Sequence, residues 1–135
     1  MAYKIEEIEG IGPSYKEKLS AANIKTTDDL LKHCAEAKGR KSIAETTGLS
    51  EKHLLNWSNK ADMMRVSGIG PQYAELLEAS GVDTVKELQH RNAENLAAKM
   101  EEINAVKNLA NATPAVSVIQ RWIEQAKTLK PTISH

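Results

Sequence analysis

The sequence predicts an all-α protein built from two copies of one helical unit. A segment near the start recurs in the second half, no stretch alternates apolar and polar residues as a half-buried strand does, and proline and glycine punctuate segments of helix length. The 135 residues are 41% hydrophobic and 27% charged, as in ordinary globular proteins. Aromatic residues make up only 4%, so we expect a core mainly of Leu, Ile, Val, Ala and Met.

The repeat begins at residues 8–19, IEGIGPSYKEKL, which match residues 66–77, VSGIGPQYAELL, after a shift of 58 residues. Further along the chain the shift grows to 65 and maps Trp57 onto Trp122, so we expect seven additional residues in the second copy, around 104–114. We predict two units, residues 1–61 and 62–135, packed with pseudo-two-fold symmetry into one body. Both tryptophans are expected in the core.

The first helix of each copy is expected to begin at Pro13 and Pro71, because proline is favoured at the first helical position. Asn23 and Gly81 then stand where a left-handed C-terminal cap belongs. Further helix starts are expected at polar N-cap residues, namely Thr26, Thr84, Ser50, and Asn92 or Thr113.

Residues 66–77, with the pattern V-x-G-I-G-P-x-x-A-x-x-L, resemble the helix-hairpin-helix motif at every key position. The first copy differs once, at Lys16, where the motif prefers a small residue. Residues 81–88 are similar to the corresponding part of the C-terminal domain found in the α subunit of RNA polymerase, and of recombinase N-terminal domains. Over nearly its whole length the chain resembles the bacterial domain-of-unknown-function 4332 family. The resemblance implies duplicated helix-hairpin-helix units with a SAM-like fold.

The glycine turns suggest a function. Two glycines permit a tight reversal with positive φ, and the N-terminus of the following helix presents free N–H groups and the positive end of the helix dipole, which can bind a phosphate. Helix-hairpin-helix proteins hold the sugar-phosphate backbone of DNA or RNA in this way, without reading bases. The resemblance implies a contact surface at Gly10, Ile11, Gly12, Ser14, Lys16, Lys18, Gly68, Ile69, Gly70 and Gln72.

The charge leaves a second function open. Eighteen basic residues balance eighteen acidic ones, so no long-range field attracts nucleic acid or a membrane. Residues 62–83 carry one basic residue, Arg65, against four acidic ones, so we expect binding to be stronger at the first turn. The alternative is that the protein is an adaptor or scaffold domain, which uses the surfaces of its hairpins to bind a protein partner or a second copy of itself. A Gly-x-Gly-Pro turn can also serve only to join two helices.

A basic cluster of Lys38, Arg40 and Lys41 stands beside Gly39, and we interpret it as a solvated loop between helices rather than a phosphate contact. The four histidines are scattered and no phosphate-loop or dinucleotide motif occurs, so we expect no enzyme activity, metal or cofactor. Cys34 is the only cysteine and no stretch has the length of a membrane span, so we expect a cytoplasmic protein. The sequence does not name the partner or the oligomeric state.

Overall fold

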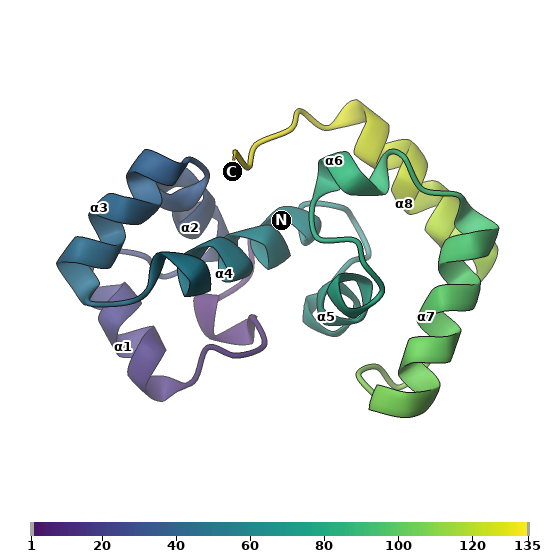
Figure 1. Cartoon of the computed structure of the whole chain (residues 1–135), viewed down its shortest axis with the longest axis horizontal. Coiled ribbons are helices and arrows are strands. Elements are labelled where there is room, and N and C mark those ends of the chain that lie inside the picture. The colour runs from purple at the N-terminus through teal and green to yellow at the C-terminus, as the bar shows by residue number, and fades with distance from the viewer. Residues whose placement is uncertain (1, 135) are drawn as a thin grey trace. The chain divides into compact units, whose positions relative to one another are not determined.

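The computed structural model describes residues 2–134, and the elements in this range are helices (Figure 1), apart from one isolated bridge between Lys4 and Thr26. The prediction of an all-α fold is confirmed. The chain forms two compact units, of which the first contains the residues up to Asp62 and those from Thr132 on, and the second contains Met63–Pro131. The sequence-based division assigned the final residues to the second copy.

The first unit begins with a short 3-10 helix, η1, followed by four α-helices. Their bounds are η1 Ile5–Glu7, α1 Pro13–Ala21, α2 Thr27–Cys34, α3 Ala37–Thr47 and α4 Glu51–Met63. The largest fully buried side chains are aliphatic, as the composition predicts, and include Ile5, Ile8, Leu19, Ile24, Leu30 and Leu54.

The second unit has four α-helices: α5 Pro71–Ala79, α6 Val85–Leu88, α7 Ala93–Lys107 and α8 Val116–Thr128. Its core is again aliphatic, with Ile69, Leu76, Leu77, Val82, Leu88 and Ile119 buried. Trp57 and Trp122 are buried as well, each 3% exposed, so their predicted core positions are confirmed. Helix α7 has 15 residues against 11 in α3, and the connection after it is longer, so additional residues lie in the predicted region.

Helices α1 and α5 end in the same way. Each begins at its predicted proline and is followed by a residue with positive φ, Asn23 at 64° and Gly81 at 95°. The next amides, of Ile24 and Val82, donate over 2.9 Å to the carbonyl five residues earlier. These bonds form a Schellman motif, which satisfies carbonyls that a helix end leaves open.

The predicted N-caps hold with one exception. The hydroxyls of Thr26 and Thr84 accept from amides three residues later at 3.1 and 3.2 Å, and Ser50 and Asn92 cap α4 and α7 in the same way. Thr113, the alternative to Asn92, caps no helix, because α8 follows Ala115 without a side-chain cap.

The interpretation of the basic cluster as a solvated loop is wrong. Lys38, Arg40 and Lys41 belong to helix α3, and Arg40 is only 4% exposed. Its Nη1 donates to two carbonyls at the end of α2, those of Cys34 at 3.0 Å and Ala35 at 2.9 Å. The guanidinium satisfies carbonyls that the end of α2 leaves open and is not available to a phosphate.

The same arginine fixes the last described residues. Arg40 Nη2 donates to the carbonyl of Ser134 at 2.6 Å, and the Ser134 amide donates to the carbonyl of Ala35 at 2.9 Å. Residues 132–134 therefore belong to the first unit, although they follow the last helix of the second.

Candidate nucleic-acid interface

The two Gly-Ile-Gly turns have the same backbone conformation. The first glycines, Gly10 and Gly68, have φ of 97° and 95°, which an L side chain rarely adopts. In each turn the isoleucine amide donates to a carbonyl three residues earlier at 3.1 Å. The second glycines, Gly12 and Gly70, have φ of −87° and −92° in the β region and are the N-caps of α1 and α5.

Each turn also packs against a tryptophan of its own unit. A Cβ on Gly10 would lie 3.6 Å from Trp57 Nε1, and one on Gly68 would lie 3.0 Å from Trp122 Nε1. Tyrosine rings cover the same indoles, with centroids 5.1 Å apart for Tyr15 and Trp57 and 5.3 Å apart in the second unit. The absence of a side chain on the first glycine lets the turn lie directly on the indole.

Main-chain donors are open at the first turn. The amides of Gly12, Ser14 and Tyr15 have no acceptor among residues 2–134, and Pro13 between them has no N–H. Gly10, Gly12 and Ser14 are exposed, so these donors stand beside water at the N-terminus of a nine-residue helix. Such a group of amides is suited to an anion.

The second turn is less open. The amides of Gly70, Gln72 and Tyr73 likewise have no acceptor among residues 2–134, and Gly68 and Gln72 are exposed, but Gly70 is half-buried. The amide of Ser67, just before the turn, donates to Gln125 Oε1 at 3.0 Å. A side-chain oxygen therefore already occupies one donor at this turn.

A lysine stands at the equivalent place behind the first turn. Lys60, which the shift of 65 residues maps onto Gln125, is 7% exposed and donates from Nζ to the carbonyl of Glu9 at 3.1 Å. Helix α4 thus brings a cationic side chain to the first turn, whereas α8 brings a neutral acceptor to the second.

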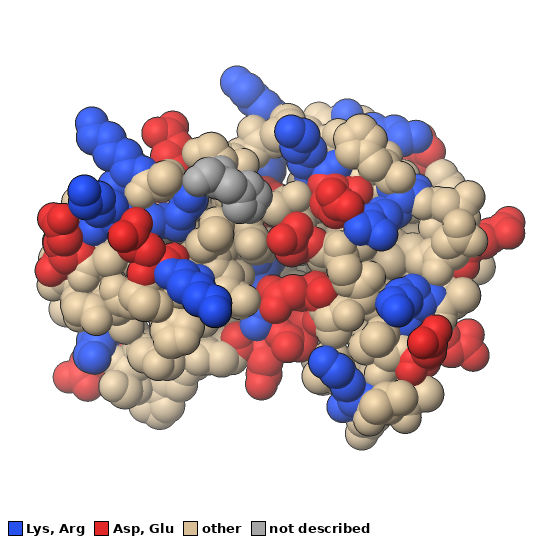
Figure 2. Space-filling view, viewed as in Figure 1, with Lys and Arg blue, Asp and Glu red and all other residues tan. Residues whose placement is uncertain are grey.

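The predicted basic side chains differ in their surroundings. Lys16 and Lys18 are both exposed, but Lys16 Nζ lies 2.9 Å from Glu6 Oε2, and this hydrogen bond lowers the pKa of Glu6 below its ordinary value. Lys18 has no ion-pair partner within residues 2–134. Blue and red side chains are interspersed over the face shown in Figure 2, in keeping with the balanced composition.

Two of the predicted contact residues are not accessible at the surface. Ile11 and Ile69 are buried, at 6% and 0% exposure, and their amides are bonded inside the turn. They position the turn from within and leave no donor for a ligand. The exposed predicted residues are Gly10, Gly12, Ser14, Lys16, Lys18, Gly68 and Gln72.

Both turns fall within the part of the chain that matches a known family. Residues 9–129 match the model of a family described as "Domain of unknown function (DUF4332)". The chain belongs to the DUF4332 family. The match runs from the first turn of this DUF4332 protein to the end of α8. No curated protein and no solved structure matched the chain.

Two residues of the DUF4332 chain that contact the turns, Lys60 and Gln125, were not predicted from the sequence. The repeat aligns them, because they stand three residues after Trp57 and Trp122. The alignment does not show that each side chain forms a hydrogen bond to the turn of its own unit, because these bonds depend on how α4 and α8 pack behind the two turns.

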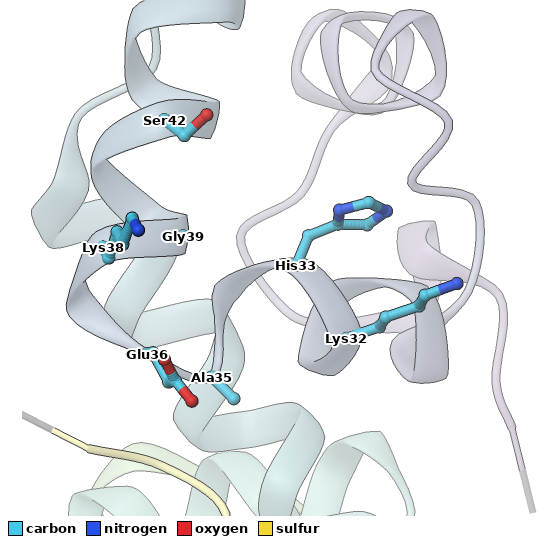
Figure 3. Close-up of a pocket in the computed structure, with 7 residues that line it drawn as sticks. All are labelled: Lys32, His33, Ala35, Glu36, Lys38, Gly39 and Ser42. Atoms are coloured by element: carbon cyan, nitrogen blue, oxygen red, sulfur yellow. The ribbon is translucent and has the colours of Figure 1, made fainter.

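A cleft of about 360 Å³ lies between α2 and α3 of the DUF4332 chain (Figure 3). Its lining residues are Lys32, His33, Ala35, Glu36, Lys38, Gly39 and Ser42. The two lysine side chains do not converge, because Lys32 extends away from the α3 side where Lys38 lies (Figure 3). A Cβ on Gly39 would lie 2.0 Å from the carbonyl oxygen of His33, so the glycine is needed where the helices approach.

Three further observations concern the thiol, metal ligands and membrane-spanning helices in the described part of the DUF4332 chain. Cys34 is buried, and burial raises the pKa of its thiol to about 11, which disfavours the nucleophilic thiolate. Within residues 2–134 no three His, Cys, Asp or Glu side chains are grouped to hold a metal ion. None of the helices described there has the length and apolar character to cross a bilayer.

Proposed function

We propose that this DUF4332 protein is a non-catalytic module of two helix-hairpin-helix units with a SAM-like fold, which binds the sugar-phosphate backbone of nucleic acid, most simply DNA. The observation that carries the proposal is the set of amides at Gly12, Ser14 and Tyr15, which have no acceptor within residues 2–134 at an exposed turn. Free amides and the helix dipole act together on a phosphate oxygen and recognise no base.

The duplication is supported by features that the two turns share and that a turn between two helices does not need. Both turns share a positive φ at the first glycine, a proline after the second, and a tryptophan packed against the first. A tyrosine covers that tryptophan at nearly the same distance in both units. Unrelated helical turns have no reason to agree on all four features.

The proposal places the main contact at the first turn. Lys16 and Lys18 follow its amides on α1, and Lys60 reaches it from α4. The second turn has Glu75 and Glu78 on the following helix and no lysine there. Because each neutralised phosphate contributes a salt-dependent term to binding, few cations imply a weak complex with a shallow dependence on salt.

The decisive experiment replaces Gly12 with valine. A Cβ there meets no atom within 4 Å, and φ is not positive, so the backbone conformation suits an ordinary residue. The added side chain covers the amides that the proposal assigns to phosphate. We expect affinity for a labelled duplex at low salt, measured by fluorescence anisotropy, to fall about tenfold.

The corresponding substitution at the second turn is Gly70→Val, and circular dichroism checks the fold of both variants. We expect the Gly70 variant to lose less affinity than the Gly12 variant. Full binding by a folded Gly12→Val protein, or no binding of either a duplex or a single strand by the wild type at low salt, contradicts the proposal.

A second candidate function is a protein adaptor, and a specific observation favours it. Val106 and Val116 are exposed, at 84% and 42%, on either side of the connection between α7 and α8. Protein contacts are marked by exposed apolar side chains that form a continuous patch, and these two valines are the residues to test for one. A pull-down from the native host, compared between wild type and a Val106→Ser, Val116→Ser variant, tests it, and equal capture by both contradicts it.

A further inference from the structure

Three rings contact one another beside the first turn. The Trp57 and His53 rings are stacked, with centroids 5.5 Å apart and planes inclined by 18°. The Tyr15 ring lies 5.1 Å from Trp57 and 5.6 Å from His53, edge-on to the imidazole. Trp57 is buried and Tyr15 half-buried, but His53 is exposed, so the cluster reaches the surface through the imidazole.

The cluster is next to the amides proposed to bind phosphate. The Nε1 atom of Trp57 lies 3.6 Å from the position of a Cβ on Gly10, and Tyr15 supplies one of the open amides. The exposed His53 ring is therefore stacked on the indole that lies directly behind the first turn.

The second unit shows that the imidazole is not required to build such a unit. Tyr73 and Trp122 repeat the tyrosine–tryptophan contact at 5.3 Å, but the shift of 65 residues places Val118 where the first unit has His53. The His53 ring thus has no counterpart in the second unit. It belongs to the unit whose turn has exposed amides and lysines close to them.

We propose that His53 stacks with an unpaired base of a nucleic acid whose phosphate is held by the first turn, and that the preferred ligand is therefore single-stranded. This inference rests on the proposed function and adds the class of partner. Aromatic rings that stack bases beside a backbone-binding groove are how proteins bind single strands without sequence preference. In a duplex the base faces are stacked on one another and are not available to a side chain.

The test compares one labelled oligonucleotide as a single strand and as a duplex, with wild type, His53→Ala and His53→Phe. Stacking on an aromatic side chain predicts that His53→Ala weakens single-strand binding about tenfold and leaves duplex binding unchanged. Phenylalanine keeps an aromatic ring without the imidazole nitrogens, so His53→Phe is expected to retain single-strand binding. Val118→Ala, the matched change in the second unit, is expected to have no effect.

A single strand with an abasic site provides a further readout, because wild type is expected to bind it more weakly than the intact strand. Single-strand binding that His53→Ala leaves unchanged, or that His53→Phe loses as fully as His53→Ala does, overturns the stacking role. An equal loss for strand and duplex also overturns it. If the wild type binds neither at low salt, the proposed function itself fails, and this inference with it.

Discussion

Trp57 Nε1 lies 3.6 Å from the position that a Cβ on Gly10 would occupy, whereas Trp122 Nε1 lies 3.0 Å from the same position on Gly68. The second distance is tighter than an ordinary contact, so the indole must move if a methyl group is added there. Both glycines also have positive φ, which disfavours any side chain.

From this difference we predict that Gly10→Ala lowers the free energy of unfolding by about 1–2 kcal/mol through backbone strain, and that Gly68→Ala lowers it further through the contact with Trp122. Urea unfolding followed by tryptophan fluorescence measures both. Equal losses in the two variants would show that the turn–indole distance has no energetic consequence.

Gly39→Ala is expected to destabilise the first unit by ~1–3 kcal/mol or more, because the new Cβ would lie 2.0 Å from the backbone oxygen of His33 and α3 must shift away from α2. The control is Lys38→Ala, an exposed neighbour on the same helix, which should change stability by no more than about 0.5 kcal/mol. Thermal unfolding of the two variants side by side decides the point, and equal stability contradicts it.

Arg40→Met is expected to release residues 132–134. It removes the donor to the Ser134 carbonyl, leaves the Cys34 carbonyl unsatisfied and takes away one of the two donors to the Ala35 carbonyl, at a cost of roughly 1–3 kcal/mol. Hydrogen exchange of the Ser134 amide should become faster. Lys41→Met, which changes the exposed next residue, should leave that exchange unchanged; a Ser134 amide that stays protected without Arg40 would contradict the prediction.

The capping box at the start of α2 predicts a loss of stability in acid. The Lys25 amide donates to the Asp29 carboxylate at 3.1 Å, and with the amide and hydroxyl of Thr26 it lowers the pKa of Asp29 below its ordinary value. A carboxyl whose folded pKa is lowered stabilises the fold above its unfolded pKa of about 3.9, and this contribution disappears as pH falls through the folded value.

Asp29→Asn should therefore lower stability at pH 7 and flatten the dependence of stability on pH in the acid range. Denaturant unfolding at a series of pH values measures this, with the exposed neighbour Asp28→Asn as the control. An acid dependence that persists in full in the Asp29 variant would assign it to other carboxyls.

Features set by local chemistry could be predicted from the sequence. A proline at a helix start, a threonine that caps an amide three residues later, and a residue with positive φ after a helix each depend on a few neighbours in the chain, and Pro13, Thr26 and Asn23 were predicted on that basis.

Features set by packing could not be predicted. The sequence indicates that Arg40 is an exposed cation, because its acceptor at Ser134 is 94 residues later in the chain and only the fold brings the two together. The roles of Lys60 and Gln125 required the position of α4 and α8 behind their turns, although the repeat aligns the two residues.

The hydrogen bond between Arg40 and Ser134 has a consequence for the order of events during synthesis. A ribosome makes the four helices of the first unit before it makes residue 134, so the nascent unit holds a guanidinium whose third acceptor does not yet exist. This hydrogen bond can form only after translation has reached residue 134. The unit that is synthesised first is thus completed only after the second unit has been made.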